Sequence, residues 1–222
     1  MDWTALTLSL KLAAWTMLVL LPIGIALGRT LAWKRFAWKP VAEGVLALPL
    51  VLPPTVLGFY LLVSLGAGSP LGQGFQALFG RTLVFSFEGL LLASVVFNLP
   101  FAIQPMQRAF ESIPQDVRDA AACCGLSRWQ TLARIELPLA WPGLLSGMVM
   151  TFAHTLGEFG VVLMVGGSIP GETRTVAIAI YDSVQSFDNT AAGVMSAVLL
   201  GLSLVAMAIV YATGGRKADR RG

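Results

Sequence analysis

Five long apolar runs constrain this chain more than any other feature of its sequence. They cover residues 5–28, 41–65, 83–106, 139–165 and 191–212. Each run is long enough to cross a hydrocarbon core of about 30 Å as an α-helix. Only 12% of the residues are charged, whereas an ordinary soluble domain has about 25%. The sequence therefore predicts an all-α integral membrane protein, with about five transmembrane helices in a single transmembrane domain over residues 1–222.

The positions of Lys and Arg predict how these helices are oriented. The four segments between the runs and the C-terminal tail carry four, one, four, one and four basic residues in turn. Cytoplasmic loops of membrane proteins carry an excess of Lys and Arg, so we expect the N-terminus outside and the C-terminus in the cytosol. The remaining basic residue, Lys11, lies within the first run and is expected to extend to the outer interface or to face a neighbouring helix.

A polar segment of about 30 residues, roughly 107–138, separates the third and fourth runs. Within it, Gly125 follows a stretch of small residues and is expected to end a short helix by adopting a positive φ. Ser127 and Gln130 have the spacing of a capping box that begins a second helix. Pro138 is expected to break that second helix just before the fourth run. The segment is therefore predicted to form a cytosolic helical hairpin, which either docks into a partner or has none.

The same segment resembles the coupling loop of permease subunits of ABC importers. The matching positions are an acidic residue, two alanines, a glycine and a distal Ile-x-Leu-Pro: Asp119, Ala120, Ala121, Gly125, Ile135, Leu137 and Pro138. Asp119 stands where the family has Glu, which keeps the charge but shortens its reach. The resemblance implies the permease fold of type I importers. It also implies that this loop docks on an ATPase subunit and transmits its closure to the membrane helices.

Two further stretches narrow the resemblance to one branch of these permeases. Residues 47–62 (ALPLVLPPTVLGFYLL) and 154–175 (HTLGEFGVVLMVGGSIPGETRT) look like those of molybdate/tungstate permease subunits. Sulfate/thiosulfate permeases share much of this pattern but are generally longer. The resemblance implies a homodimer in the bacterial cytoplasmic membrane, two ABC ATPase subunits and an extracytoplasmic oxyanion-binding protein as partners, and no nucleic acid.

The sequence points away from chemistry carried out by the chain itself. It lacks the GxxxxGK[ST] phosphate loop, so ATP and Mg are expected on a partner subunit and no cofactor or metal is expected on this chain. An enzyme embedded in the membrane would need clustered carboxylates or a metal site, and the chain has one histidine. An ion-coupled secondary transporter remains the alternative of another class; it predicts broken helices at matching positions of two halves.

The candidate translocation pathway consists of polar residues and prolines within the runs. Thr151, His154 and Glu158 are spaced to share one face of a helix, which also includes Gly147. Ionisable residues inside spans are costly and often functional, so this face lines or gates the anion path, or else a His–Glu pair holds helices together.

The second and third runs and the segment after the fourth carry further candidates. Pro53 and Pro54 are expected to kink or break the second run beside Thr55, either as a gate or as a static bend. Asn98 is expected to hydrogen-bond between helices. Arg174 is expected to be a solvated loop arginine or to meet an anion or the binding protein, followed by a short interfacial helix over residues 176–184.

Overall fold

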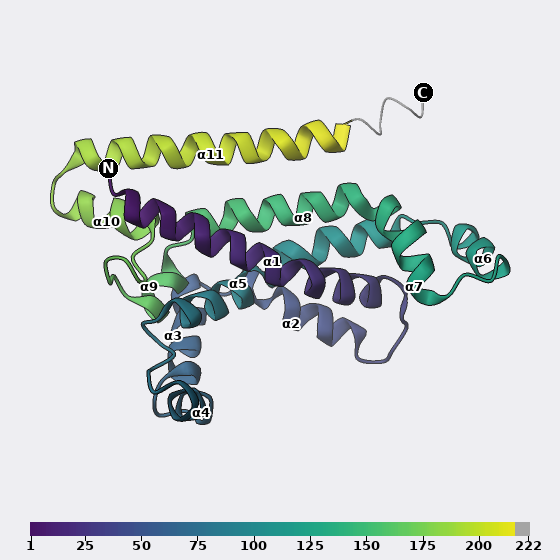
Figure 1. Cartoon of the computed structure of the whole chain (residues 1–222), viewed down its shortest axis with the longest axis horizontal. Helices are drawn as coiled ribbons and strands as arrows, with labels where there is room; N and C mark the ends of the chain where they lie inside the picture. The colour runs from purple at the N-terminus through teal and green to yellow at the C-terminus, as the bar shows by residue number, and fades with distance from the viewer. Residues whose placement is uncertain (216–222) are drawn as a thin grey trace.

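The structure is a computed structural model that describes residues 1–215. The basic residues of the tail that support the predicted orientation, 216–221, lie outside the described residues. Four long helices run side by side along the longest axis of the molecule (Figure 1): α1 (Trp3–Trp33), α5 (Phe87–Glu111), α8 (Leu137–Gly157) and α11 (Asn189–Gly215). The shorter elements are α2 (Lys39–Val51), α3 (Pro54–Leu65), α4 (Pro70–Phe79), α6 (Gln115–Cys123), α7 (Arg128–Thr131), the π-helical turn η1 (Leu132–Glu136), α9 (Gly160–Gly166) and α10 (Val176–Gln185). The described residues contain no strand.

The centre of the fold is a three-helix bundle in which α5 contacts both α1 and α8. Glycines on the two outer helices make this close approach possible. A Cβ atom on Gly28 of α1 would lie 3.0 Å from the backbone nitrogen of Gln107, and one on Gly147 of α8 would lie 3.0 Å from the carbonyl oxygen of Ala102. Small residues at such contacts let membrane helices pack backbone against backbone. Helix α11 packs on α8 and α10 at the edge of this bundle.

The second apolar run is broken, as Pro53 and Pro54 predict. Helix α2 ends at Val51, α3 begins at Pro54, and the two axes differ by 111°. Proline has no N–H group and its ring clashes with the preceding turn, so the helix cannot continue through the pair. As a result α3 runs across the direction of the long helices (Figure 1). The described chain therefore has four helices suited to cross a membrane, or five if α2 and α3 count as one span.

The fourth run differs from its prediction at both ends. The helical segment begins earlier, at Arg128, and continues through η1 into α8, so the prediction that Pro138 breaks the helix is wrong. In η1 the N–H of Leu137 donates to the carbonyl of Leu132, five residues back, and Pro138 follows in the first turn of α8. Proline is tolerated in the first turn of an α-helix. Because α8 begins directly after the wider π turn, Pro138 falls in such a first turn and the helical segment continues through it.

At its other end, the fourth run is interrupted before α9. Glu158 has extended backbone angles (φ −73°, ψ 130°), and α9 begins two residues later at Gly160. The prediction of one continuous helix to residue 165 is therefore wrong. Glycines at 157 and 160 flank the break, and glycine is a weak helix former. The predicted short helix after Arg174 is confirmed as α10.

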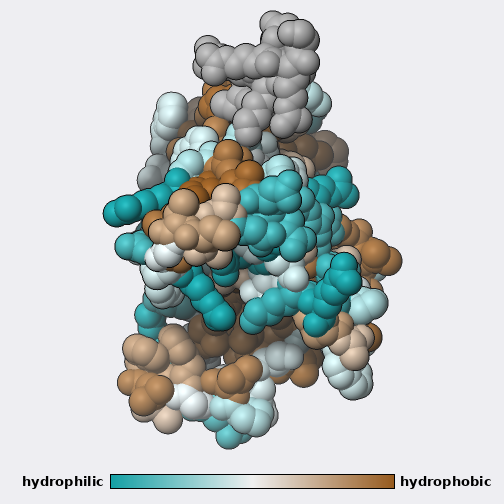
Figure 2. All heavy atoms as spheres, turned by 90° about the vertical axis from the view of Figure 1, so that its right-hand side faces the viewer, coloured by the Kyte–Doolittle hydropathy of each residue, from teal (hydrophilic) through white to brown (hydrophobic). Residues whose placement is uncertain are grey.

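The end of the molecule that carries α6 and α7 is its polar end. Figure 2 views the molecule from this end and shows hydrophilic residues gathered across the middle of the face. The distribution of Lys and Arg predicts that this end lies in the cytosol, so we refer to it as the predicted cytosolic end.

Candidate functional site

The loop between α5 and α8 forms the predicted hairpin, with a sharp turn at Gly125. Gly125 has φ +73°. The N–H of Leu126 donates to the carbonyl of Ala121 (3.2 Å) and the N–H of Gly125 donates to that of Ala122 (3.0 Å). These two bonds form a Schellman motif, which satisfies the last carbonyls of α6. Ser127 and Gln130 then make both bonds of the predicted capping box at the start of α7.

One face of α6 is exposed at the tip of this hairpin. Asp119 and Ala120 are exposed, whereas Ala121 is buried against the rest of the chain. Cys123 and Cys124 are free thiols and are also exposed. The residues that match the coupling loop therefore differ in exposure. Asp119 and Ala120 are available to a partner, and Ala121 packs α6 against the rest of its own chain. Ile135 lies in η1, and Leu137 and Pro138 begin α8.

The hairpin is attached to the end of α1 by an aromatic cluster. The guanidinium of Arg118 in α6 lies 4.2 Å from the ring centroid of Trp33, and that of Arg29 lies 5.2 Å from the same ring. Trp33 also contacts Phe110 edge to face, with ring centroids 5.5 Å apart. Cation–π contacts of this kind are favourable over an indole face. The position of α6 is therefore tied to the last turn of α1.

A buried ion pair joins the same end of α1 to the π turn. Arg29 donates from Nε to Oε2 of Glu136 (2.6 Å) and from Nη2 to Oε1 (3.1 Å). The Glu136 side chain is only 2% exposed, and that of Arg29 is 33% exposed. Bidentate pairs of this kind are strong and fix orientation. We name Arg29 and Glu136 the inner ion pair. Sequence reasoning missed it; the one signal was an acidic residue between the apolar Ile135 and Leu137.

The candidate pathway residues gather around a recess of about 600 Å³ where α3, α5, α8 and α9 meet. The residues that line it are Pro54, Thr55, Phe97, Ala153, His154, Gly157, Glu158, Phe159 and Gly160. Four of the six predicted pathway residues are among them, and Pro53 and Thr151 are not. Residues from the broken second run and from the end of α8 thus face one hollow.

A chain of buried polar groups lies behind this recess. Asn98 is fully buried and donates from Nδ2 to the carbonyl of Ser94 (2.9 Å) and, at the limit of hydrogen bonding, to Oε2 of Glu158 (3.5 Å). Its Oδ1 accepts from Nδ1 of His154 (2.9 Å). Thr16 of α1 donates to the Ser94 hydroxyl (3.0 Å). The predicted interhelical role of Asn98 is confirmed, and it joins α1 and α5 to the end of α8.

The shared helix face predicted for the fourth run is only partly present. Gly147 and Thr151 are buried, with Gly147 against α5, whereas Glu158 lies beyond the end of α8. Among the described contacts, His154 and Glu158 meet through Asn98 and not as a direct pair. The His154 ring stacks on Phe101, with ring centroids 3.9 Å apart. No group of three or more His, Cys, Asp or Glu residues in residues 1–215 is arranged to hold a metal ion.

Two smaller recesses continue along α2 and α5 toward the predicted cytosolic end. Their volumes are about 320 and 300 Å³, and both are lined by Pro100, Gln104 and Arg108. Arg108 was counted in the sequence only as a loop charge. In the structure it lies in the last turn of α5, where its side chain is exposed beside both recesses. One side of the bundle therefore carries all three of these hollows.

The family described as the binding-protein-dependent transport system inner membrane component matches residues 21–218. The chain belongs to this family. It is therefore a multi-pass protein of the inner membrane, as predicted. It is 43% identical over 217 residues to the molybdenum transport system permease protein ModB of Azotobacter vinelandii, a match that covers 98% of this chain and 96% of that protein.

Two further similarities place this inner membrane component among its relatives. It is 30% identical over 209 residues to the probable sulfate transport system permease protein cysT of Chlorella vulgaris, covering 94% of this chain and 78% of that protein. A chain of the MetNI methionine ABC transporter, solved in inward-facing conformations, has the same fold with a TM-score of 0.65 and 17% identity, covering 96% of this chain and 94% of that one. The predicted permease fold is confirmed.

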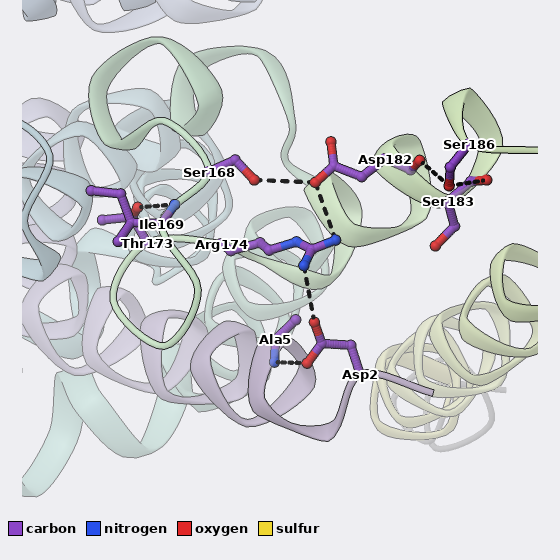
Figure 3. A network of polar contacts seen from close by, with 9 residues as sticks. All are labelled: Asp2, Ala5, Ser168, Ile169, Thr173, Arg174, Asp182, Ser183 and Ser186. Atoms are coloured by element: carbon purple, nitrogen blue, oxygen red, sulfur yellow. Dashed lines mark hydrogen bonds and ion pairs between the residues drawn. The ribbon is translucent and has the colours of Figure 1, made fainter. Parts of the chain in front are cut away.

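At the opposite end of this inner membrane component, Arg174 takes part in a network of charges (Figure 3). Its Nη2 lies 3.2 Å from Oδ2 of Asp182 in α10, and its Nη1 lies 3.7 Å from Oδ2 of Asp2 before α1. Asp2 also caps α1 by accepting from the N–H of Ala5 (2.9 Å). The prediction of a solvated arginine is thus wrong, because two carboxylates lie within its reach. We name Asp2, Arg174 and Asp182 the outer network.

Lys11, which the sequence placed within the first span, faces a neighbouring helix. Its Nζ lies 4.4 Å from the ring centroid of Phe87 at the start of α5. Of the two predicted possibilities, the structure shows the contact with a neighbouring helix. The aromatic ring offers the ammonium group a favourable partner near the outer end of α1.

Proposed function

We propose that this chain is the membrane-spanning subunit of an ATP-driven importer of molybdate and, because it is a similar tetrahedral dianion, tungstate. The proposal rests above all on the 43% identity to the Azotobacter vinelandii molybdenum permease across 98% of the chain. Two copies of the chain form the pathway, two ABC ATPase subunits bind from the cytosol, and an extracytoplasmic protein delivers the oxyanion.

The exposed face of α6 is the surface we assign to the ATPase. Asp119 and Ala120 lie on it, and the small side chains around them allow close approach. When the ATPase subunits close, α6 moves with them. The segment α7–η1–α8 is helical from Arg128 to Gly157, so a displacement of α6 is carried directly along α8 to His154. Closure opens the pathway outward, and hydrolysis with release resets it.

The recess around His154 suits an anion that passes and is not retained. Its described lining contains no Lys or Arg, and it includes the carboxylate of Glu158, which repels an oxyanion when ionised. Nδ1 of His154 donates to Asn98, so the other ring nitrogen can donate to an anion only when the ring is protonated. We therefore assign this site a low affinity, and we assign the selection of substrate to the binding protein.

The experiment that tests this function measures ATPase activity of the chain co-purified with its ATPase in lipid. The binding protein is added empty or loaded with molybdate, tungstate or sulfate. Stimulation by molybdate and tungstate but not by sulfate is the expected result. Stimulation by sulfate alone would keep the importer and move it to the sulfate branch, to which the Chlorella vulgaris relative belongs. Failure of the two subunits to co-purify would contradict the docking of α6 and return the ion-coupled alternative.

A substitution at the turn tests the docking hairpin separately. Gly125→Leu should abolish uptake while the protein remains in the membrane, because a positive φ is strained for leucine and the added side chain obstructs docking. Gly80→Leu is the matched control. Gly80 also ends a short helix with a positive φ (+69°), and no atom lies within 4 Å of its Cβ position either. Full uptake by Gly125→Leu would show that α6 does not couple the two subunits.

A further inference from the structure

A groove at the predicted cytosolic end, between α1 and α7, is separate from the three recesses described above and shares Arg29 with the inner ion pair. It has a volume of about 530 Å³. Its lining comes from the last turns of α1 and from the start of the helix after Gly125: Pro22, Ile25, Ala26, Arg29, Thr30, Arg128, Trp129 and Leu132. None of these residues lines the three hollows along α2, α3, α5 and α8. The groove is therefore separate from the candidate pathway.

The lining changes from apolar to polar along α1. Pro22, Ile25 and Ala26 are apolar and lie within the first apolar run, whereas Arg29 and Thr30 follow it toward the cytosol. At about 1.5 Å per residue, Pro22 and Arg29 are separated by about 10 Å along the helix axis. One end of the groove thus lies at the depth of lipid tails and the other at the depth of the headgroups.

The headgroup end of the groove carries uncompensated positive charge. Arg29 uses Nε and Nη2 on Glu136, and the structure gives its Nη1 no partner among the described residues. Arg128 is exposed and forms no ion pair with any residue in the described part of the chain. Because Glu136 balances Arg29, the groove keeps the net charge of Arg128.

Trp129 completes the groove with an indole that is 79% exposed. Tryptophan is enriched at membrane interfaces, where its apolar ring and its N–H lie at headgroup level. Basic pockets between membrane helices on the cytoplasmic side are typical binding sites for anionic headgroups. The groove combines these features with an apolar channel for an acyl chain.

We propose that this groove binds one anionic phospholipid of the cytoplasmic leaflet. The phosphate lies between Arg29, Thr30 and Arg128, and one acyl chain lies against Pro22 and Ala26. Charge complementarity selects this occupant, since a zwitterionic lipid has no net charge to offer Arg128. The bound lipid would join α1 to the helix that follows the docking turn.

Native mass spectrometry of the intact transporter, permease with its ATPase, tests the proposal without depending on transport. The complex is released from nanodiscs of phosphatidylcholine containing a fraction of phosphatidylglycerol, and the phospholipids that stay bound are identified. We expect phosphatidylglycerol to be retained in preference, and excess inorganic phosphate not to displace it. Arg128→Gln should weaken its retention about fivefold, the effect of one basic residue near a membrane surface.

Two further variants separate a lipid site from general electrostatics. Ala26→Trp fills the apolar channel without changing charge and should also reduce retention, whereas Arg35→Gln removes an exposed charge in the loop after α1, outside the groove, and should not. Equal retention of both lipids, or equal loss in Arg35→Gln and Arg128→Gln, would overturn the proposal. So would a photo-crosslinker at position 129 that captures only the ATPase or a second permease copy.

Discussion

The two ends of α1 are both held by an arginine and carboxylates, but in different surroundings. At the predicted cytosolic end, the inner ion pair is bidentate and Glu136 is 2% exposed. At the other end, Arg174 of the outer network is shared between Asp2 and Asp182, whose side chains are 31% and 38% exposed. The distances differ too: 2.6 Å for the closest contact inside and 3.2 Å outside.

This difference shows where the chain is fixed and where it is adjustable. Removing either member of an ion pair with a buried carboxylate strongly destabilises the fold, because the remaining charge stays out of water. Removing one carboxylate from a shared, partly exposed arginine destabilises the fold less, because the arginine still has its second partner and contact with water. The fixed end lies beside the hairpin that we assign to the ATPase. A rigid connection there allows a displacement of α6 to move α8 by a similar amount. The adjustable end lies beside α10.

The largest effect should follow from breaking the inner ion pair. Glu136→Gln removes the carboxylate and leaves Arg29 without its charge partner, which should cost about 3 kcal/mol of the free energy of unfolding. The measurement is unfolding of the purified chain by SDS in bicelles. The double variant Arg29→Met with Glu136→Leu is the control, because replacing both partners with apolar residues should recover most of the loss. A single variant as stable as wild type would remove the contrast between the two ends.

A smaller loss should follow from removing the centre of the outer network. Arg174→Gln should lower the free energy of unfolding by about 1 kcal/mol, the scale of partly exposed ion pairs. The same unfolding assay measures it, with Arg81→Gln as a control because Arg81 pairs with Glu88 in a more exposed setting, where the arginine side chain is 55% exposed. A loss by Arg174→Gln as large as that of Glu136→Gln would mean that the outer end is equally fixed.

The smallest effect should come from one carboxylate of the outer network. Asp182→Asn leaves Asp2 beside Arg174, so we expect the free energy of unfolding to fall by only about 0.5 kcal/mol. Salt at about 1 M should make this difference from wild type smaller still, because it screens the charges. Repeating the unfolding titration at low and high salt measures this. The inner ion pair should respond less to salt because Glu136 is buried. Equal salt sensitivity at both ends would contradict the assigned difference in exposure.

The sequence correctly predicted those parts of the molecule whose structure depends only on neighbouring residues. Gly125 takes a positive φ and Ser127 caps α7 because both depend on a few adjacent backbone groups. Pro53 and Pro54 break the second span for an equally local reason. Likewise, the apolar runs predicted the long helices, since the bilayer requires about 20 residues of low polarity in each.

The features that were missed depend on residues far apart in the chain or on the competition between two helical forms. Arg29 and Glu136 are 107 positions apart, and Arg174 meets Asp2 from the other end of the sequence. Helical spacing placed Glu158 on the face of His154, but the helix ends first. Pro138 was expected to end a helix because the rule assumes α-helical geometry, which the π turn replaces.

The π turn also makes the relation between α7 and α8 a matter of residue count. A π turn holds one residue more than an α turn would, and one residue corresponds to about 100° of rotation around a helix. Because the extra residue of Leu132–Glu136 is taken up within one turn, the helix on either side keeps nearly the direction it would have in a continuous α-helix. Deleting one residue from this pentapeptide should therefore leave the hairpin aimed much as it is, whereas deleting one residue from the regular part of α8 would turn the hairpin by about 100° relative to the rest of that helix. A sequence alignment with a gap inside the pentapeptide is thus compatible with an unchanged hairpin direction, and one with a gap inside Leu137–Gly157 implies a differently aimed hairpin.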